Sequence, residues 1–194
     1  MSSVVLTGDT SGAGTITVPA VAGTFTATIG AATGTHYPFT AGTAVASTSG
    51  TSIDFTSIPS WVKRITVMLQ GVSTNGSSIP QIQIGSGSVS TSSYNATTSY
   101  GSSAGQFSTL TSGVPLSVSN VAGASAVFSG AVVLILVGSN TWIAQGSNAI
   151  NTNNIAVVIA GTSPALSGAL DRVRITTVNG TDTFDAGLIN ILYE

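Results

Sequence analysis

Short runs of alternating apolar and polar residues recur along the chain, and they predict β-strands. In residues 65–70 (ITVMLQ), Ile65, Val67 and Leu69 fall on one face of an extended strand. Residues 172–178 (RVRITTV) alternate in the same way. No long window keeps the helical apolar period without interruption by Gly, Pro or β-branched residues. The pattern therefore predicts an all-β chain.

Two continuous apolar runs stand out, residues 131–137 (AVVLILV) and 155–160 (IAVVIA). Both are rich in β-branched residues and far shorter than the ~20 residues that a membrane-spanning helix needs. We expect them to be strands buried on both faces. Because the first residues also lack the charged and apolar regions of a signal peptide, we expect a chain made and kept in a cytoplasm, with no membrane insertion.

The last part of the chain combines a turn signal with a strongly apolar strand. Asn179-Gly180 predicts a type I′ hairpin, with the next strand returning through residues 181–184. Gly187 is expected to mark a bulge. Residues 188–194 (LINILYE) carry apolar side chains on both faces, so this strand is predicted at the centre of a sheet or against another subunit.

The remaining strand candidates are short. They are residues 15–18, 24–29, 52–58, 82–84 and 115–118. A chain of about ten short strands with Gly- and Ser-rich connections favours an all-β β-sandwich or jelly roll.

The distribution of large apolar residues divides the chain. Residues 1–47 contain mostly small residues and are predicted to be an extended Gly/Thr/Ala-rich attachment segment. Residues 48–194 are predicted to be a β-sandwich domain. Within it, residues 85–105 carry Tyr94 and Tyr100 but no charge, and they are expected to form a long loop.

Composition restricts the kinds of partner. Only 5% of the residues are charged, 42% are hydrophobic, and cysteine is absent. A surface built on hydroxyls and amides, without disulfides, is expected to gain stability by association with other subunits. The four Lys and Arg residues cannot supply the many phosphate contacts on which nucleic-acid binding depends, so no nucleic-acid partner is expected.

Few residues could carry catalysis. His36 is the only histidine, and it lies in the small-residue segment. Asp182 and Asp185 are close in sequence, but Asp182 follows a turn signal where short polar side chains cap the backbone. We therefore expect no enzyme, no catalytic or metal-binding residue and no cofactor. The alternative is a polysaccharide hydrolase that uses Asp182, Asp185 or Asp171.

The arginines form a second candidate group. Arg64, Arg172 and Arg174, with Asp171, are predicted to make an ion-pair cluster; an anion site built by the three arginines is the alternative. The acids available for pairing are Asp54, Asp171 and Asp185.

Three aromatic residues are candidates for ligand or interface contact. Trp142 lies among polar turn residues and is expected to be exposed, and Tyr94 and Tyr100 lie in the predicted loop. Such rings can stack on sugars or anchor an interface, so a carbohydrate-binding module is an alternative function.

Two long strings are similar to known proteins. Residues 50–78 (GTSIDFTSIPSWVKRITVMLQGVSTNGSS) and 166–194 (LSGALDRVRITTVNGTDTFDAGLINILYE) resemble a domain that recurs in tail-fibre and other virion proteins of tailed bacteriophages and prophages. The most specific pieces are IPSWVKRITVML and FDAGLINILYE. The Gly/Thr/Ala-rich residues near the amino terminus resemble the repeats that precede such modules.

This resemblance implies a non-catalytic virion protein, assembled in the host cytoplasm and built as a homotrimer. Residues 1–47 would join it to other proteins of the tail or capsid, and residues 48–194 would face outward, with a host surface glycan as a further partner. A tail fibre or fibre-like appendage is the leading function. A capsid decoration protein, of the cement or head-fibre type, is the alternative within the virion.

Overall fold

Strands dominate the computed structural model, which describes residues 39–101 and 105–194. The larger sheet contains β1 (Thr40–Ala41), β2 (Val45–Ala46), β4 (Arg64–Thr74), β7 (Asn95–Tyr100), β8 (Gln106–Leu110), β10 (Phe128–Gly138), β11 (Thr141–Ile150), β12 (Ile155–Thr162) and β14 (Phe184–Tyr193). The smaller sheet contains β3 (Ser52–Thr56), β5 (Pro80–Ser86), β6 (Ser88–Val89), β9 (Val114–Pro115) and β13 (Arg172–Thr177).

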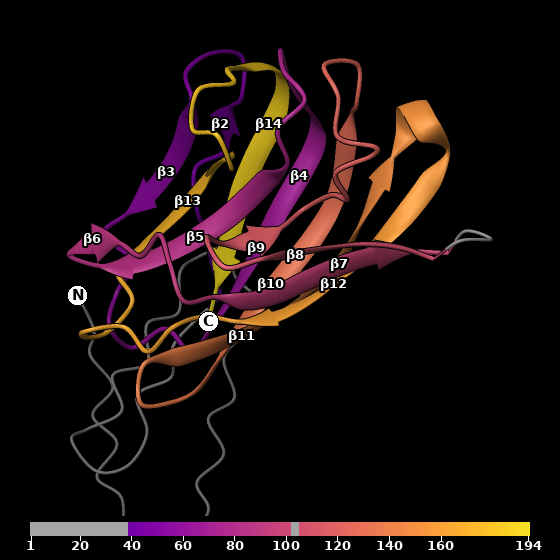
Figure 1. Ribbon diagram of the computed structural model, residues 1–194. Coiled ribbons are helices and arrows are strands. Elements are labelled where there is room, and N and C mark those ends of the chain that lie inside the picture. The colour runs from indigo at the N-terminus through magenta and orange to yellow at the C-terminus, as the bar shows by residue number, and fades with distance from the viewer. Residues whose placement is uncertain (1–38, 102–104) are drawn as a thin grey trace, which may run out of the picture. The chain divides into compact units, whose positions relative to one another are not determined.

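The two antiparallel sheets form a β-sandwich, so the predicted all-β class is confirmed (Figure 1). The larger sheet has the order β1-β14-β4-β10-β11-β12-β7-β8, with β2 also beside β14. The smaller sheet has the order β3-β13-β5-β6, with β9 beside β5. In the described residues the one helical element is a 3₁₀ turn, Asn151–Asn153, so none of their helices is long and apolar enough to cross a membrane.

One hydrophobic core fills the space between the sheets. Ile65, Val67 and Leu69 of β4 are buried in it, as are Val173 and Ile175 of β13. These are the apolar positions of the alternating runs, so each strand keeps one face toward the core. Burial of each such side chain stabilises the fold by roughly 1.5–3 kcal/mol.

The carboxy-terminal strand β14 lies inside the larger sheet, as predicted for the run LINILYE. It pairs with β4 on one side and with the short strands β1 and β2 on the other. The predicted irregularity at Gly187 is confirmed, because the register between β14 and β4 shifts on either side of Ala186 and Gly187 has φ 97°. A Cβ at Gly187 would lie 2.5 Å from the carbonyl oxygen of Gly71, so the close strand approach requires glycine.

The predicted hairpin at Asn179-Gly180 is wrong. The strands before and after this turn belong to different sheets, since β13 pairs with β3 and β5 whereas β14 pairs with β4. Gly180 has φ 68°, but Asn179 is outside the left-handed region that a type I′ turn would require at both positions. Instead, Asn179 Oδ1 accepts hydrogen bonds from the backbone N–H groups of Thr181 and Asp182, which turns the chain from one sheet to the other.

The predicted long loop over residues 85–105 is also wrong, because it contains β6 and β7. The buried positions of β7 are occupied by Ala96 and Thr98. These small side chains fit the sandwich but give only a weak alternating pattern in the sequence. Strand β11 was missed for a similar reason, since Ala144 and Asn148 occupy inward positions.

The structure places the beginning of the sandwich earlier than the predicted boundary between residues 47 and 48. Thr40 pairs with Tyr193 and Val45 with Ile189, and the Ser47 hydroxyl donates a hydrogen bond to the carbonyl oxygen of Ala186. The described strands belong to one compact unit, Tyr37–Glu194. The rest of the predicted attachment segment, with the strand candidates 15–18 and 24–29 and with His36, lies outside the described residues.

Candidate assembly surface

Charged residues are segregated in this fold. Between Ile65 and Leu170 the sequence contains no Asp, Glu, Lys, Arg or His. This stretch includes β7, β8, β10, β11 and β12, which are adjacent in the larger sheet. The five strands therefore carry no charged side chain on either face.

The outward positions of these strands follow from alternating burial and from the strand register. One row crosses the sheet through Phe107, Ser99, Val158, Ser147 and Ala131. The neighbouring row contains Thr109, Thr97, Ala160, Gln145 and Val133. We call these ten residues the charge-free face. Its most exposed large apolar side chains are Phe107, at 71% of its full exposure, and Val158, at 63%.

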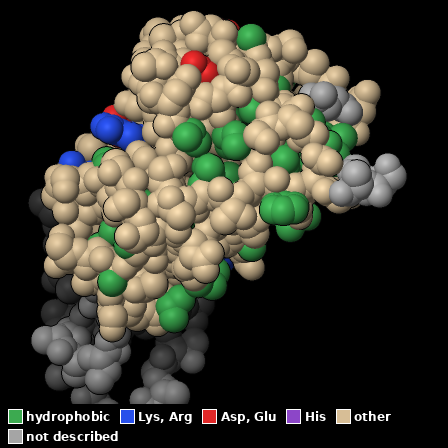
Figure 2. Space-filling model, in the orientation of Figure 1, with side chains coloured by type: hydrophobic (Ala, Val, Ile, Leu, Met, Phe, Trp, Pro, Cys, Tyr) green, Lys and Arg blue, Asp and Glu red, His purple; other side chains and the backbone are tan. Residues whose placement is uncertain are grey.

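Sparse charge extends to other parts of the surface. In Figure 2, which shows the molecule from the same side as Figure 1, blue and red atoms are few, and green apolar groups are scattered among tan polar ones. Such a surface has little charge repulsion to keep copies of the chain apart.

The prediction that residues 131–137 and 155–160 are buried on both faces is wrong for the chain by itself. In β12, Val157 and Ile159 point into the core, whereas Val158 on the other face is exposed. In β10, Val132 and Leu134 are buried, and the outward side chains between and beside them are only half-buried. The second apolar face of each run therefore lies on the outside of the sandwich.

Strand β8 adds an open edge to this surface. Within the described residues β8 pairs only with β7, so the backbone groups on its other side are not used by the sheet. Its sequence, QFSTL, contains no charge and no proline, the features with which proteins usually protect an edge strand. The edge can therefore accept a strand from another chain.

Tyr94, one of the three candidate contact residues, is a structural residue. It is buried, and its hydroxyl accepts a hydrogen bond from the backbone N–H of Ile84 at 2.8 Å. The same hydroxyl lies 3.2 Å from the carbonyl oxygen of Ser90, to which it can donate. Burial raises the pKa of Tyr94 to about 12. The prediction that Tyr94 contacts a ligand from an exposed loop is therefore wrong for the chain by itself.

Trp142 is buried as well, at 3% of its full exposure, so the prediction of an exposed ring is wrong. It belongs to β11 and points into the core, and its Nε1 has no hydrogen-bond partner in the described part of the chain. Tyr100, at the end of β7, is half-buried, and its hydroxyl accepts a hydrogen bond from Asn120 Nδ2 at 3.0 Å. Of the three rings, Tyr100 alone is partly accessible.

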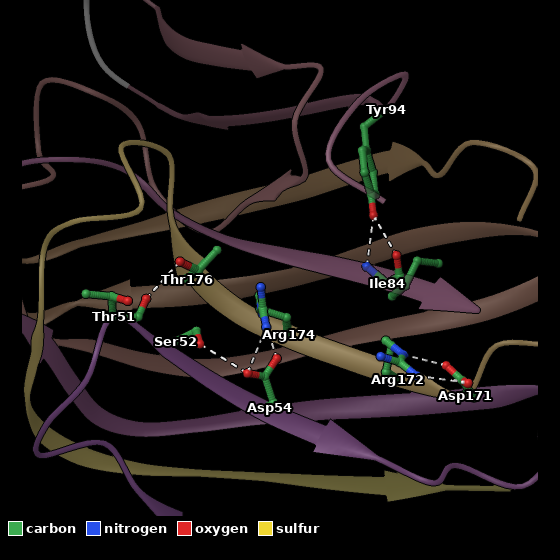
Figure 3. Close-up of polar contacts among 9 residues, drawn as sticks. All are labelled: Thr51, Ser52, Asp54, Ile84, Tyr94, Asp171, Arg172, Arg174 and Thr176. Carbon is green, nitrogen blue, oxygen red and sulfur yellow. Dashed lines mark hydrogen bonds and ion pairs between the residues drawn. The ribbon is translucent and has the colours of Figure 1, made fainter. Parts of the chain in front are cut away.

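The predicted arginine cluster is divided between the two sheets. On β13, Arg174 Nε lies 2.6 Å from Asp54 Oδ1, and Arg172 Nε lies 2.7 Å from Asp171 Oδ1 (Figure 3). Arg64 begins β4 in the other sheet and pairs with Glu194 at 2.7 Å. Pairing with Asp54 and Asp171 is thus confirmed, but the single cluster and the three-arginine anion site are not formed.

The acidic residues make local contacts. Arg172 lowers the pKa of Asp171 by its hydrogen bond. Asp182 accepts hydrogen bonds from the backbone N–H of Ser78 and from Asn179 Nδ2, which is the predicted turn role. Asp185 does not pair with an arginine, and it accepts a hydrogen bond from the Ser73 hydroxyl. The described residues contain no group of three or more His, Cys, Asp or Glu side chains that could hold a metal ion.

Comparisons of the chain with protein-family models, with curated proteins and with solved structures find no match. The surface chemistry described above is therefore the observation from which a function can be proposed, and the resemblance expected for residues 50–78 and 166–194 stays a prediction.

Proposed function

We propose that the chain is a structural subunit of a bacteriophage particle, a tail fibre or fibre-like appendage that associates with copies of itself through the charge-free face. The observation that carries the proposal is the outward position of Phe107 and Val158 on five adjacent strands without charge. The assignment to a bacteriophage particle depends on the sequence resemblance. The β-sandwich fold is compatible with that assignment.

The physical case for self-association begins with the apolar side chains. Burying Phe107 and Val158 in a contact would contribute roughly 1.5–3 kcal/mol each. The charge-free face carries no charges that would repel another subunit, and around a three-fold axis the same face of all three subunits can converge. The open edge of β8 offers backbone hydrogen bonds to a strand of a neighbouring subunit. These features support a homo-oligomer, and the resemblance favours a trimer.

The strand order leaves room for a second contact. The described chain begins at β1, on the side of the larger sheet opposite to β8. Attachment to other virion proteins would use the residues that precede β1 in the chain, and association of subunits would use β8. In this proposal the subunit is assembled in the host cytoplasm and then belongs to the virion.

A matched pair of charged substitutions tests the contact. Val158→Lys places a charge in the charge-free face, whereas Val178→Lys places one on an exposed valine in the turn after β13. Light scattering at micromolar concentration should give a trimer for the wild type and for Val178→Lys, and a monomer for Val158→Lys. Circular dichroism should show the same strand content in all three. A wild type that is monomeric at this concentration would refute self-association.

Capsid decoration is the second candidate within the virion, because the same subunit could cover a capsid lattice. The copy number in purified particles separates the two roles. A tail appendage is present in few copies at one end of the particle, whereas a decoration protein follows the many equivalent positions of the capsid.

A carbohydrate-binding module outside a virus is the third candidate. It depended on exposed rings that stack on sugars, and the burial of Tyr94 and Trp142 removes two of the three. Of the three candidate rings, only Tyr100 can still stack on a sugar.

A further inference from the structure

The smaller sheet carries a groove of ≈ 330 Å³ on its outer face. Two rows of side chains cross β3, β13 and β5 there, in register. One row contains Ser52, Thr176 and Gln81, and the other contains Arg174 and Gln83; Asp54 continues the second row beside Arg174 but does not line the groove. We call this the polar groove. Its volume is near the lower end of the roughly 300–1,000 Å³ of small-molecule sites.

The two glutamines form a rigid part of the polar groove. Ile82 and Ile84 of β5 point into the core, so Gln81 and Gln83 point the other way, yet their exposed fractions are only 2% and 5%. Ser112 lies over them. Gln83 Nε2 donates to the Ser112 carbonyl oxygen at 2.8 Å, and the Ser112 hydroxyl donates to Gln81 Oε1 at 2.7 Å.

The loop that covers the glutamines approaches so closely because its next residue is glycine. A Cβ at Gly113 would lie 2.7 Å from Gln81 Oε1 and 2.8 Å from the carbonyl oxygen of Ile82. The wall of the groove is thus fixed to β5 by both packing and hydrogen bonds. A pre-ordered polar site loses less entropy when a ligand binds.

Arg174 and Asp54 form an ion pair whose net charge is zero. Arg174 binds Asp54 through Nε and Nη2, and Asp54 also accepts from the Ser52 hydroxyl (Figure 3). A guanidinium has five N–H donors, and those of Arg174 outside this pair bond no acceptor among the described residues. Because Asp54 neutralises Arg174, the pair does not favour an anion over a neutral ligand.

The lining limits the chemistry of a ligand. Beside the two rows, the groove is bordered by hydroxyl and amide residues, with Val178 as its one large apolar side chain among the described residues. A hydrophobic ligand would find almost no apolar surface. A ligand with several hydroxyl groups could accept from Arg174 and exchange hydrogen bonds with the lining hydroxyl groups of Ser52 and Thr91.

We propose that the polar groove binds a neutral saccharide, held by hydrogen bonds to Arg174 and to the hydroxyl groups of Ser52 and Thr91, which line it. This inference rests on the proposed function and gives the particle subunit a ligand outside the particle, but it is tested on the isolated chain, so it can fail or succeed independently of assembly. Without a stacking ring, each site binds in the millimolar range, about −4 kcal/mol. Several copies in one particle would raise the overall affinity through multivalency.

The test is a binding titration by NMR with methyl glycosides of glucose, galactose and mannose and with their sulfated counterparts. Arg174→Gln is the test variant. Arg172→Gln is the matched control, because Arg172 lies on the same strand, also pairs with an aspartate and is not part of the groove lining. At least one neutral glycoside should bind the wild type, Arg174→Gln should weaken its binding about tenfold or more, and Arg172→Gln should leave it within about twofold.

A second variant distinguishes a loss of ligand contact from a folding defect. Thr91→Val removes an exposed hydroxyl at the rim of the groove and should also weaken binding, while the melting temperature stays the same. Three results would overturn the inference: no neutral glycoside binds at about 10 mM, only sulfated glycosides bind and salt abolishes their binding, or Arg172→Gln weakens binding as much as Arg174→Gln.

Discussion

The hydroxyl of Tyr94 provides a partner for a buried backbone group. It accepts the N–H of Ile84 in β5, so Tyr94→Phe would leave that N–H without a partner inside the sandwich. We expect a loss of about 1–3 kcal/mol in the free energy of unfolding, measured by urea denaturation. Tyr100→Phe is the control, because its partner Asn120 is exposed and can bond water instead. Equal losses in the two variants would contradict this role.

The same residue predicts a change in stability at high pH. Burial raises the Tyr94 pKa from 10.0 to about 12, so the folded state holds the phenol proton more tightly than the unfolded state does. The stabilising contribution is complete below pH 10, and it is lost as the pH rises through about 12. Tyr94→Phe should therefore lose less stability than the wild type between these two values, as followed by denaturant midpoints. Parallel curves would show that Tyr94 does not titrate differently on folding.

Glycine at position 187 is required by both its backbone angle and its surroundings. With φ 97° and a neighbouring carbonyl oxygen 2.5 Å from an added Cβ, Gly187→Ala should destabilise the fold by about 1–3 kcal/mol or more. Gly123→Ala is the control, because an added Cβ there meets no atom within 4 Å and the backbone angle is ordinary. Thermal melts of the two variants should separate clearly.

At the scale of elements, strands could be predicted where large apolar side chains alternate with polar ones along the sequence. β4, β13 and β14 were found because Ile, Val and Leu mark their inward positions. β7 and β11 were missed because Ala, Thr and Asn occupy many of theirs, and a small or amide side chain does not reveal whether it faces the core. The prediction of a hairpin at Asn179-Gly180 was wrong for another reason. A turn signal in the sequence does not show whether the next strand pairs in the same sheet or in the other sheet.

The candidate surfaces were only partly predictable. The absence of charge from residues 65–170 is visible in the sequence and could have indicated a surface for association. The register was needed to place Phe107, Ser99 and Val158 on one face, since they come from three separate strands. The polar groove depends even more on the fold, because its residue Arg174 pairs with Asp54, which is 120 positions away in sequence, on a neighbouring strand.

Strand β14 is expected to be essential for folding. It contributes the buried side chains of Ile189 and Ile191 and pairs with β4, β1 and β2. Removing residues 188–194 would lose roughly 1.5–3 kcal/mol for each large buried side chain and unpair its neighbours, a loss comparable with the ~5–15 kcal/mol stability of a domain. The truncated chain should give little soluble protein. Glu194→Gln should melt like the wild type, because its pair with Arg64 is a surface contact worth under about 1 kcal/mol. A soluble truncation with the wild-type melting temperature would show that the strand is dispensable.

At the scale of the whole molecule, two truncations separate attachment from folding. Deleting residues 1–38 leaves β1, β2 and all their pairing with β14 in place. Deleting residues 1–47 also removes these strands, together with the buried Ser47 and its hydrogen bond to Ala186. The shorter deletion should therefore keep the melting temperature, whereas the longer one should lower it, since it exposes Ile189 and Ile191 at a new sheet edge.

Particle incorporation then tests the attachment proposal without the ambiguity of unfolding. If residues 1–38 join the subunit to other virion proteins, the chain lacking them should remain a folded trimer but be absent from particles purified after complementation of a deletion strain. Val158→Lys supplies the complementary case, a chain that keeps its first residues and loses the subunit contact. Normal incorporation of the chain lacking residues 1–38 would place attachment within the sandwich.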